Sequence, residues 1–521
     1  MNLSSARHKD IVAALMVAAV ALAARLVLLP YATTDGSNSA ARVWIAWRWW
    51  DDPGLITEGV WGPLHFYLIG GVLALTGDPV TAPIILHVLF GVAAAVLFYI
   101  FVRLEFTGPN SALLAALAFA LYPVLLRASI AVRAESPFVF FVLGCMVMLS
   151  LARTRPPTLA LAAAAGLALT LASMLRYEGW LLTPLLALLL WPRLTPMIVF
   201  VAVASLHPVL WMIGNTIAHG DPLYPISFAH SWELGSMGRS DLSMGERLRA
   251  AFGFASATAR GMTLLAALFV FAGGIIALLR HRRAAAWLIP PAGLLSLLLW
   301  SVYQGSLVPK SSYTVMTGSI LFPFSALAFQ AVGAERWRGA ILGVAAMATV
   351  GLVAVGSCAR CFDAVGLQAL RGISPVPGFE NQETADELAQ IVADNLGEPP
   401  AGVVTDFYGY GGTNWVQLLA RVHPDRIFLA PWGPHQPLDQ DMLVAFAEAH
   451  PEGILLIRPG SRFAGQLGLD LDLGAADLGG RPVRLEEVAS VAWPYNDGVP
   501  LAADDAGEER VVVFRYATPG D

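Results

Sequence analysis

The chain has 521 residues, of which 56% are hydrophobic and only 13% are charged, and its mean hydropathy is +0.63. This composition lies far outside the usual range of soluble domains and predicts a protein that is inserted in a membrane. The formal net charge is −6, but residues 358–521 alone carry 24 acids against 10 arginines, a balance that excludes nucleic acid and anionic lipid as partners of this part.

Apolar runs long enough to cross a bilayer recur through the first 357 residues. A helix needs roughly 20 apolar residues to cross a hydrocarbon core of about 30 Å. The first run continues to Pro30 past any small-residue cleavage site, so we expect a retained helix rather than a signal peptide. In all we expect about eleven membrane-spanning helices, at residues 11–30, 79–101, 111–126, 135–152, 158–175, 179–191, 196–217, 261–279, 284–302, 314–332 and 339–357.

The connections between these helices differ in charge. Every second connection is short and basic, as at Arg153 and Arg155, whereas nearly all acids of the membrane part lie in the opposite, longer connections. Because Lys and Arg collect in short cytoplasmic loops, the amino terminus is predicted to be cytoplasmic. An odd number of spans then puts residues 358–521 outside the cytoplasm, in a multi-pass protein of the plasma or inner membrane.

The connection after the first span has catalytic potential. Asp35 follows the helix almost immediately, and an acid held by a helix end at the membrane surface is suited to act as a general base towards a hydroxyl. The alternative is a solvated aspartate that caps the next helix. Residues 40–50 interleave tryptophan with arginine, which predicts a helix in the membrane interface. The apolar stretch 61–71 is expected to lie along the surface or to re-enter the membrane.

Three further positions on the predicted outer side bring charged residues together. Arginine and lysine near a bilayer surface are suited to bind phosphate oxygens. The alternative is mutual salt bridging that neutralises charge at helix ends. The residues concerned are Arg127, Arg133 and Glu135 in one connection, Arg176 and Glu178 in the next, and Lys310 at the mouth of the span at 314–332.

Residues 358–521 alternate short apolar runs with helical stretches. This order predicts a small, largely parallel sheet in a soluble α/β domain. The Pro/Gly-rich stretch 372–380 is the expected joint between this domain and the membrane domain at 1–357. No metal site is expected at Cys358 and Cys361, which lack His or Cys at zinc-site spacing. The expected helices are near 383–396, 414–421 and 439–450, and the expected strands are at 402–406, 426–430, 453–457 and 510–516.

Several motifs occur in a characteristic order in residues 10–335. They are Asp35 after the first helix, Gly-Pro-Leu-His-Phe-Tyr-Leu at 62–68, Arg-Ala-Glu-Ser-Pro-Phe at 133–138, the run ending in Arg-Tyr-Glu-Gly at 166–179, and His-Gly-Asp-Pro-Leu-Tyr at 219–224. In this order the chain resembles the polyprenyl-phosphate-sugar-dependent glycosyltransferases of the GT-C fold. Within them it is most similar to the protein O-mannosyltransferase and lipid A aminoarabinose transferase group.

The resemblance implies a reaction and roles for residues. Members of the group take a sugar from a lipid phosphate in the outer leaflet and transfer it, usually with inversion, to an acceptor. Asp35 matches their general base, and Glu135 matches the acid that they carry at the start of the fourth helix. Arg176 matches a basic residue placed to bind the donor phosphate, with Lys310, Arg127 and Arg133 as further candidates. Other site candidates are Glu178, His65 and Tyr313.

The chain also departs from the group. Gly36 follows Asp35 where the O-mannosyltransferases have a second acid, so Asp51, Asp52 or Glu58 competes with Glu135 for the role of second carboxylate. The lysine of their Lys-Pro-Pro-Leu motif is absent, because Trp61 stands in its place. No ligand spacing argues for a metal site, although a divalent cation bridging the outer acids is left open as a cofactor.

Two other classes of function compete with the glycosyltransferase. A multi-spanning transporter would also hold charges at helix ends, but the hydropathy shows no internal repeat and no matching pair of broken helices. A membrane-anchored binding or assembly protein would act through residues 358–521. For the glycosyltransferase, the expected partners are the bilayer, a polyprenyl-phosphate-linked sugar and a lipid, glycan or protein acceptor.

Overall fold

The computed structural model divides the chain into two compact units, which are described separately. The first unit is Met1–Ala32, Gly54–His65 and Ile84–Ser374, and the second is Thr33–Pro53, Phe66–Pro83 and Pro375–Asp521. The described residues are 3–29, 37–237, 243–304, 307, 311–333, 386–406, 418–430, 440–458, 462–471, 473–492, 495–496, 499–500 and 510–518. Asp35, Lys310, the expected span at 339–357 and the expected domain boundary at residue 357 lie outside them.

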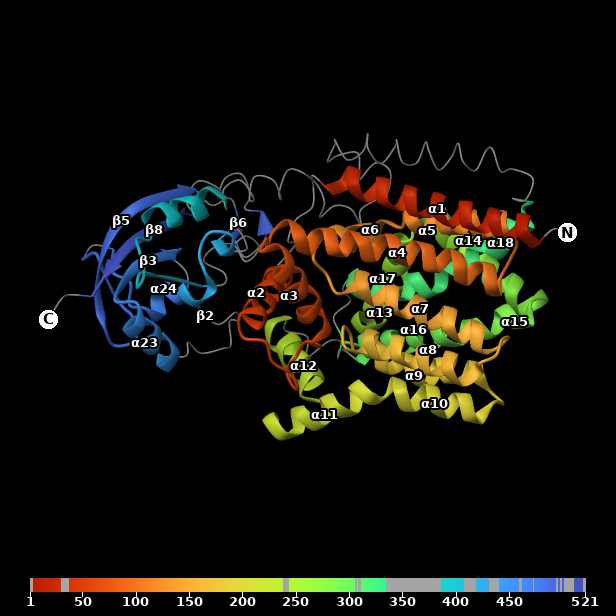
Figure 1. Cartoon of the computed structure of the whole chain (residues 1–521). Helices are drawn as coiled ribbons and strands as arrows, with labels where there is room; N and C mark the ends of the chain where they lie inside the picture. Colours follow the sequence, from red (N-terminus) through yellow and green to blue (C-terminus); the bar gives the residue numbers. More distant parts are fainter. Residues whose placement is uncertain are drawn as a thin grey trace. The chain divides into compact units, whose positions relative to one another are not determined.

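The secondary structure elements of the first unit are helices throughout its described part (Figure 1). Its longer helices are α1 (Leu3–Leu28), α4 (Thr81–Glu105), α5 (Pro109–Ala120), α6 (Pro123–Ile130), α7 (Glu135–Ala152), α8 (Thr158–Ser173), α9 (Glu178–Ala187), α10 (Leu194–Ala204), α11 (Leu206–His219), α12 (Tyr224–Met237), α13 (Met244–Gly261), α14 (Leu264–Arg280), α16 (Ile289–Gln304), α17 (Ser311–Leu321) and α18 (Ser325–Ala331). Shorter helical turns are η2 (Leu188–Leu190), α15 (Arg282–Ala285), η3 (Ala286–Leu288) and η4 (Phe322–Phe324).

Six helical stretches in the described residues are long and apolar enough to cross a membrane, or up to eight if each of two bent pairs is one span. The bent pairs are α5 with α6, at 54°, and α13 with α14, at 101°. The spans expected at 158–175 and 179–191 correspond to the shorter apolar helices Thr158–Ser173 and Glu178–Leu190. The chain is therefore a multi-pass membrane protein, and the count of about eleven spans stays a prediction.

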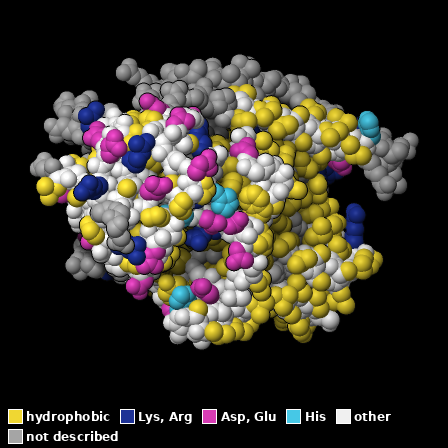
Figure 2. Space-filling view, turned by 60° about the vertical axis from the view of Figure 1, so that its left-hand side comes forward, with side chains coloured by type: hydrophobic (Ala, Val, Ile, Leu, Met, Phe, Trp, Pro, Cys, Tyr) yellow, Lys and Arg dark blue, Asp and Glu magenta, His cyan; other side chains and the backbone are white. Residues whose placement is uncertain are grey.

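Small residues let neighbouring helices approach closely within the first unit. A Cβ atom added to Gly166 of α8 would lie 2.8 Å from the carbonyl oxygen of Phe200 in α10. Such close backbone approach is how helices pack in lipid, where apolar burial alone gives little driving force. The outer surface is apolar, with Leu264, Leu268 and Phe271 of α14 exposed. Figure 2 shows hydrophobic side chains covering a broad area of this unit's surface.

Two helices of the second unit follow the first membrane helix. They are α2 (Ser37–Asp51) and α3 (Leu64–Thr76), whose first two residues belong to the first unit. The ring of Trp49 lies 4.9 Å from that of Tyr67. Gly70 allows this contact, because a Cβ atom there would lie 2.4 Å from the Trp49 ring. The predicted helix at 40–50 is thus present as α2.

The rest of the second unit is an α/β domain built on a six-stranded sheet in the order β2-β1-β3-β8-β5-β4. Its strands are β1 (Gly402–Asp406), β2 (Ile427–Ala430), β3 (Glu452–Ile457), β4 (Ala475–Asp477), β5 (Pro482–Ala492) and β8 (Arg510–Ala517), and a separate pair is β6 (Tyr495–Asn496) with β7 (Val499–Pro500). Helices α23 (Gln440–Ala449) and α24 (Arg462–Gln466) lie on one side of the sheet, and the helix at 386–395 lies on the other (Figure 1).

Alternation along the strands gives this domain two apolar layers. Val404 and Leu455 belong to one buried cluster with Leu443 of α23 and Phe463 of α24. Their neighbour Val403 is also fully buried, and strand geometry directs it to the opposite face. Both faces of the central strands are therefore covered, which explains why they could be recognised in the sequence as short continuous apolar runs.

The expected sheet was wrong in its strand directions. Strands β2, β1 and β3 are parallel, as predicted, with Val403 opposite Ile427 and Ile454. However, β8 runs antiparallel to β3, and β5 and β4 continue the sheet in antiparallel pairs. We missed β5 because Arg484, Glu486 and Glu487 interrupt its apolar residues and most of the strand is half-exposed or exposed, so it lacks the continuous apolar run of a buried strand.

Candidate functional site

A buried cluster of charged side chains lies where α8 ends and α7 and α9 begin. The Arg176 guanidinium donates through Nη1 to Glu135 Oε1 at 2.8 Å. Its Nη2 donates to Glu178 Oε1 at 3.0 Å and its Nε donates to Glu178 Oε2 at 3.2 Å. The three side chains are 14%, 6% and 9% exposed in the order Arg176, Glu135 and Glu178. Such paired N–H···O bonds give a strong and well-oriented ion pair.

The local sequence places these charges. Glu135 and Glu178 occupy the first turns of α7 and α9, where free backbone N–H groups and the helix dipole favour a carboxylate. Arg176 lies in the turn between α8 and α9. Burial by itself would lower the pKa of the Arg176 guanidinium, but the carboxylates of Glu178 and Glu135 outweigh this and raise its pKa above the ordinary value. The group therefore stays a cation.

Tyr313 lies against the same cluster. The Arg176 guanidinium carbon is 5.5 Å from the centre of the Tyr313 ring, within the range of a cation–π contact. Tyr313 belongs to α17, which follows the segment that contains Lys310. The structure thus brings together Arg176, Glu135, Glu178 and Tyr313, all of which were candidates in the sequence.

The segment Gly54–His65 packs against the turn between α8 and α9 and against α11. The Tyr177 hydroxyl donates to the carbonyl oxygen of Val60 at 2.7 Å, and Leu64 N–H donates to Met174 at 3.2 Å. Gly62 has to be glycine, because a Cβ atom there would lie 2.3 Å from the Met174 carbonyl oxygen. Gly62 and Leu64 of the motif at 62–68 therefore pack directly on the turn that holds Arg176.

The segment Gly54–His65 also contains Glu58, one of the candidates for the second carboxylate. Glu58 Oε2 lies 2.8 Å from His219 Nε2, and the His219 ring stacks on Tyr224 at 3.7 Å. Gly59 N–H also donates to the buried Asn215 side chain at 3.1 Å. The motif at 219–224 thus anchors this connection to α11 and α12. Glu58 is engaged with His219 in this arrangement rather than with Arg176.

None of the contacts printed for the described residues joins the other candidates to Arg176. Arg127 in α6 and Arg133 before α7 are half-buried, and each has an interaction partner. His65 is fully buried, with its Nε2 2.7 Å from Nε2 of His87 in α4. Asp52 is exposed at the end of α2 in the second unit.

Arg25 of α1 was missed in the sequence. Its side chain is completely buried, and Nη1 donates to the Ala21 carbonyl oxygen at 2.9 Å. Among the described residues, Nε and Nη2 have no hydrogen-bond partner. They lie beside Gly91, where a Cβ atom would be 2.5 Å from Nε and 2.3 Å from Ser129 Oγ. An arginine inside an otherwise apolar run was the signal that could have found it, since buried charges are costly in membranes.

A second group missed in the sequence lies at the C-terminal end of α8, the helix that precedes Arg176. His207 of α11 is close to Ser173 of α8, with Nδ1 3.3 Å from the Ser173 hydroxyl. Its ring contacts those of Trp180 and Trp211, at 6.3 Å and 5.3 Å between centres. The His207 Nε2 atom and both indole N–H groups are buried, and no hydrogen-bond partner for them occurs in the described part of the chain. Their spacing resembles that of residues in an apolar helix core, so these polar atoms could not be singled out from the sequence.

Comparisons with known proteins show which folds this structure is similar to. Residues 60–213 match the family model described as dolichyl-phosphate-mannose-protein mannosyltransferase. No match was found among the curated proteins. The structure is similar to ArnT from Cupriavidus metallidurans bound to undecaprenyl phosphate, with a TM-score of 0.63, 14% identity, and coverage of 96% of this chain and 97% of that one. The apo state of that protein gives a TM-score of 0.62 at 13% identity, with the same coverage.

A more distant likeness is to the apo form of the Archaeoglobus fulgidus oligosaccharyltransferase, with a TM-score of 0.50 and 12% identity. It covers 86% of this chain and 69% of that one. The predicted GT-C fold with a C-terminal sheet domain is confirmed. The family match covers residues 60–213, and the likenesses to the solved structures, at 12–14% identity, show the GT-C fold.

Proposed function

We propose that this GT-C protein transfers a sugar from a polyprenyl-phosphate carrier to an acceptor outside the cytoplasm, with inversion at the anomeric carbon. The observation that carries the proposal is the likeness to a structure bound to undecaprenyl phosphate, which extends over 96% of this chain. The family match at residues 60–213 supports the same class of donor, a sugar on a lipid phosphate. The acceptor is a lipid, a glycan or a protein that carries a nucleophilic hydroxyl.

The reaction is a single displacement. The acceptor oxygen forms a bond to the anomeric carbon as the bond between that carbon and the phosphate oxygen breaks. Asp35 takes the proton of the acceptor hydroxyl, and polyprenyl phosphate leaves with the electron pair. Holding the acceptor, the base and the donor in line removes much of the entropic barrier.

The leaving phosphate gains negative charge and needs fixed cationic partners. Arg127, Arg133 and Lys310 are the proposed contacts. Arg176 uses three of its five N–H groups for Glu135 and Glu178, so two remain for a phosphate oxygen. Glu135 is the proposed second carboxylate, and its ion pair with Arg176 holds it in one position.

The test is a transfer assay on the full chain in nanodiscs with radiolabelled polyprenyl-phosphate sugars. We expect turnover of a lipid-linked sugar by the wild type and a loss of at least about 100-fold in Asp35→Asn, because general bases typically contribute about 10²–10⁴-fold. The control is Glu448→Gln, which removes an exposed charge from the α/β domain, and it should retain the wild-type rate.

Two results would overturn the proposal. Transfer that survives Asp35→Asn would reject this residue as the base. Uptake of a solute into proteoliposomes, without turnover of any lipid-linked sugar, would favour a transporter over a glycosyltransferase.

A further inference from the structure

Helix α11 has an apolar face and a polar face. The apolar face is exposed, and its residues include Leu206, Leu210, Ile213 and Ile217. The opposite face is buried and carries His207, Trp211 and Asn215 at intervals of four residues. Polar groups within a membrane are costly, and they commonly face the interior of a helix bundle and mark the path of a substrate. The buried face of α11 is therefore a candidate binding surface.

The C-terminal half of this face finds its partners within the chain. Asn215 accepts a hydrogen bond from Gly59 N–H at 3.1 Å and donates to the Trp211 carbonyl oxygen at 2.9 Å. One turn later, His219 Nε2 lies 2.8 Å from Glu58 Oε2. The connection Gly54–His65 thus provides partners at this end of α11.

The N-terminal half of the face differs. His207 Nε2, Trp211 Nε1 and Trp180 Nε1 are buried, and the described residues offer none of them a hydrogen-bond partner, which costs stability. Trp180 comes from α9, and its ring contacts that of His207, as does the ring of Trp211. One indole N–H of this kind would carry little weight, because Trp47 and Trp287 have the same feature. Here three such atoms belong to one group of contacting rings.

The contacts of Ser173 determine the roles of the two His207 nitrogens. The Ser173 hydroxyl donates its single proton to the Thr170 carbonyl oxygen at 2.7 Å. Its oxygen can then only accept from His207 Nδ1, which is 3.3 Å away and therefore carries a proton. A neutral His207 then presents Nε2 as an acceptor, whereas the two indole groups are donors. A matching ligand must both donate and accept hydrogen bonds.

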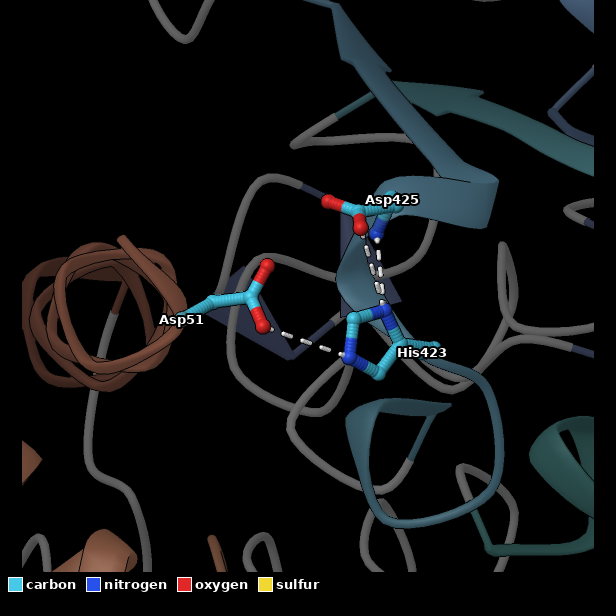
Figure 3. Close-up of side chains that lie close together, drawn as sticks. All are labelled: Asp51, His423 and Asp425. Atoms are coloured by element: carbon cyan, nitrogen blue, oxygen red, sulfur yellow. Dashed lines mark hydrogen bonds and ion pairs between the residues drawn. The ribbon is translucent and has the colours of Figure 1, made fainter.

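The polar cluster drawn in Figure 3 is of a different kind, because water reaches all of its side chains. Asp51, His423 and Asp425 are 43%, 50% and 66% exposed. The two carboxylates lie on opposite sides of the imidazole ring, with Asp51 Oδ1 3.7 Å from Nε2 and Asp425 Oδ2 3.5 Å from Nδ1. This arrangement suits two separate ion pairs with His423 rather than one ion held by all three side chains.

We propose that His207, Trp180 and Trp211 bind hydroxyl groups of the sugar on the lipid-linked donor. A hydroxyl both donates and accepts, whereas an ionised phosphate or carboxylate only accepts and cannot serve His207 Nε2. A sugar carries several hydroxyls, so one ligand can reach separate polar atoms. Trp180 is half-buried, so the group is not sealed, and it follows Glu178 by two residues. This assignment rests on the proposed function, because it names the part of the donor site that holds the sugar.

The test is equilibrium binding to the full chain in nanodiscs, with radiolabelled undecaprenyl-phosphate sugars compared with undecaprenyl phosphate that carries no sugar. His207→Asn can keep an N–H towards Ser173 and removes Nε2, and Trp211→Phe keeps an aromatic ring and removes the N–H. We expect each to weaken binding of the sugar-linked lipid by at least about tenfold, because a buried hydroxyl loses its partner. Binding of undecaprenyl phosphate should change little.

The matched control is Trp287→Phe, which removes the same kind of buried indole N–H from η3 and should leave both affinities unaltered. The unfolding temperature of each variant separates a loss of binding from a loss of folding. Trp180→Phe repeats the test from another helix if His207→Asn does not fold.

Two results would overturn this assignment. Wild-type affinity for the sugar-linked lipid in all the variants would mean that the three polar atoms are served by ordered water only. Equal weakening for the lipids with and without sugar would mean a general distortion of the site. Failure of the proposed function is a separate outcome, because the transfer assay then shows no turnover by the wild type while the binding comparison still reports on the sugar.

Discussion

At the scale of the residue, the central feature is a buried arginine between two carboxylates. Arg176 is held by Glu135 and Glu178, and all three side chains are largely removed from water. In a setting of this kind the net free energy of the ion pair is small, but the cost of leaving one member unpaired is large. The roles proposed for Arg176 and Glu135 therefore depend on the cluster staying complete.

Arg176→Gln should destabilise the protein by about 3–5 kcal/mol, because it leaves two carboxylates buried without a cation. The measurement is the unfolding temperature in detergent, followed by scanning fluorimetry. The control is Arg481→Gln, which breaks the exposed pair with Glu448 and should cost about 0–1 kcal/mol. Equal shifts in the two variants would contradict a tightly paired, buried Arg176.

At the scale of the element, the central feature is the connection Gly54–His65, which packs against the turn that holds Arg176. Its backbone packs against the turn between α8 and α9 and against α11, where a Cβ atom on Gly214 would lie 1.9 Å from the Thr57 carbonyl oxygen. Glycine is needed at these contacts because no side chain fits between two backbones. The glycine of the motif at 62–68 is thus required for packing against Met174, which could not be seen from the sequence alone.

Gly62→Ala should lower the stability by about 1–3 kcal/mol, because the added methyl group overlaps the Met174 carbonyl oxygen and forces the connection to shift. The unfolding temperature reports this change. Gly54→Ala is a control in the same connection, since a Cβ atom there meets nothing within 4 Å. The packing argument fails if both substitutions have the same effect.

At the scale of the whole molecule, charge asymmetry sets the proposed orientation in the membrane. Short basic connections such as that at Arg155 are expected in the cytoplasm, and the α/β domain is expected outside. Single cysteines can test this, after Cys358 and Cys361 are replaced by serine, because Cys145 is buried. A cysteine introduced at Glu448 should react with an impermeant maleimide in intact cells, whereas one at Arg155 should react only after permeabilisation. The reverse labelling would invert the proposed topology and place the acidic connections in the cytoplasm.

The sequence by itself determined the class of the molecule. Long apolar runs report a local requirement, the thickness of the bilayer, so helices such as α4 and α7 were found close to their observed bounds. Strands β1, β3 and β8 were found for a similar reason, since buried strands are short continuous apolar runs. These assignments did not need the resemblance to a family, because each apolar run lies within one segment of the sequence.

Only the tertiary structure decided which distant residues meet. Arg176 pairs with Glu135 across two helices, and Asp51 faces His423 from the other end of the chain. Neither pairing leaves a periodic signal, because each depends on how whole elements pack and not on the spacing of residues along one of them. The antiparallel position of β8 beside β3 was beyond the sequence for the same reason: strand direction is set by chain connections in space, whereas apolar periodicity is identical in both directions.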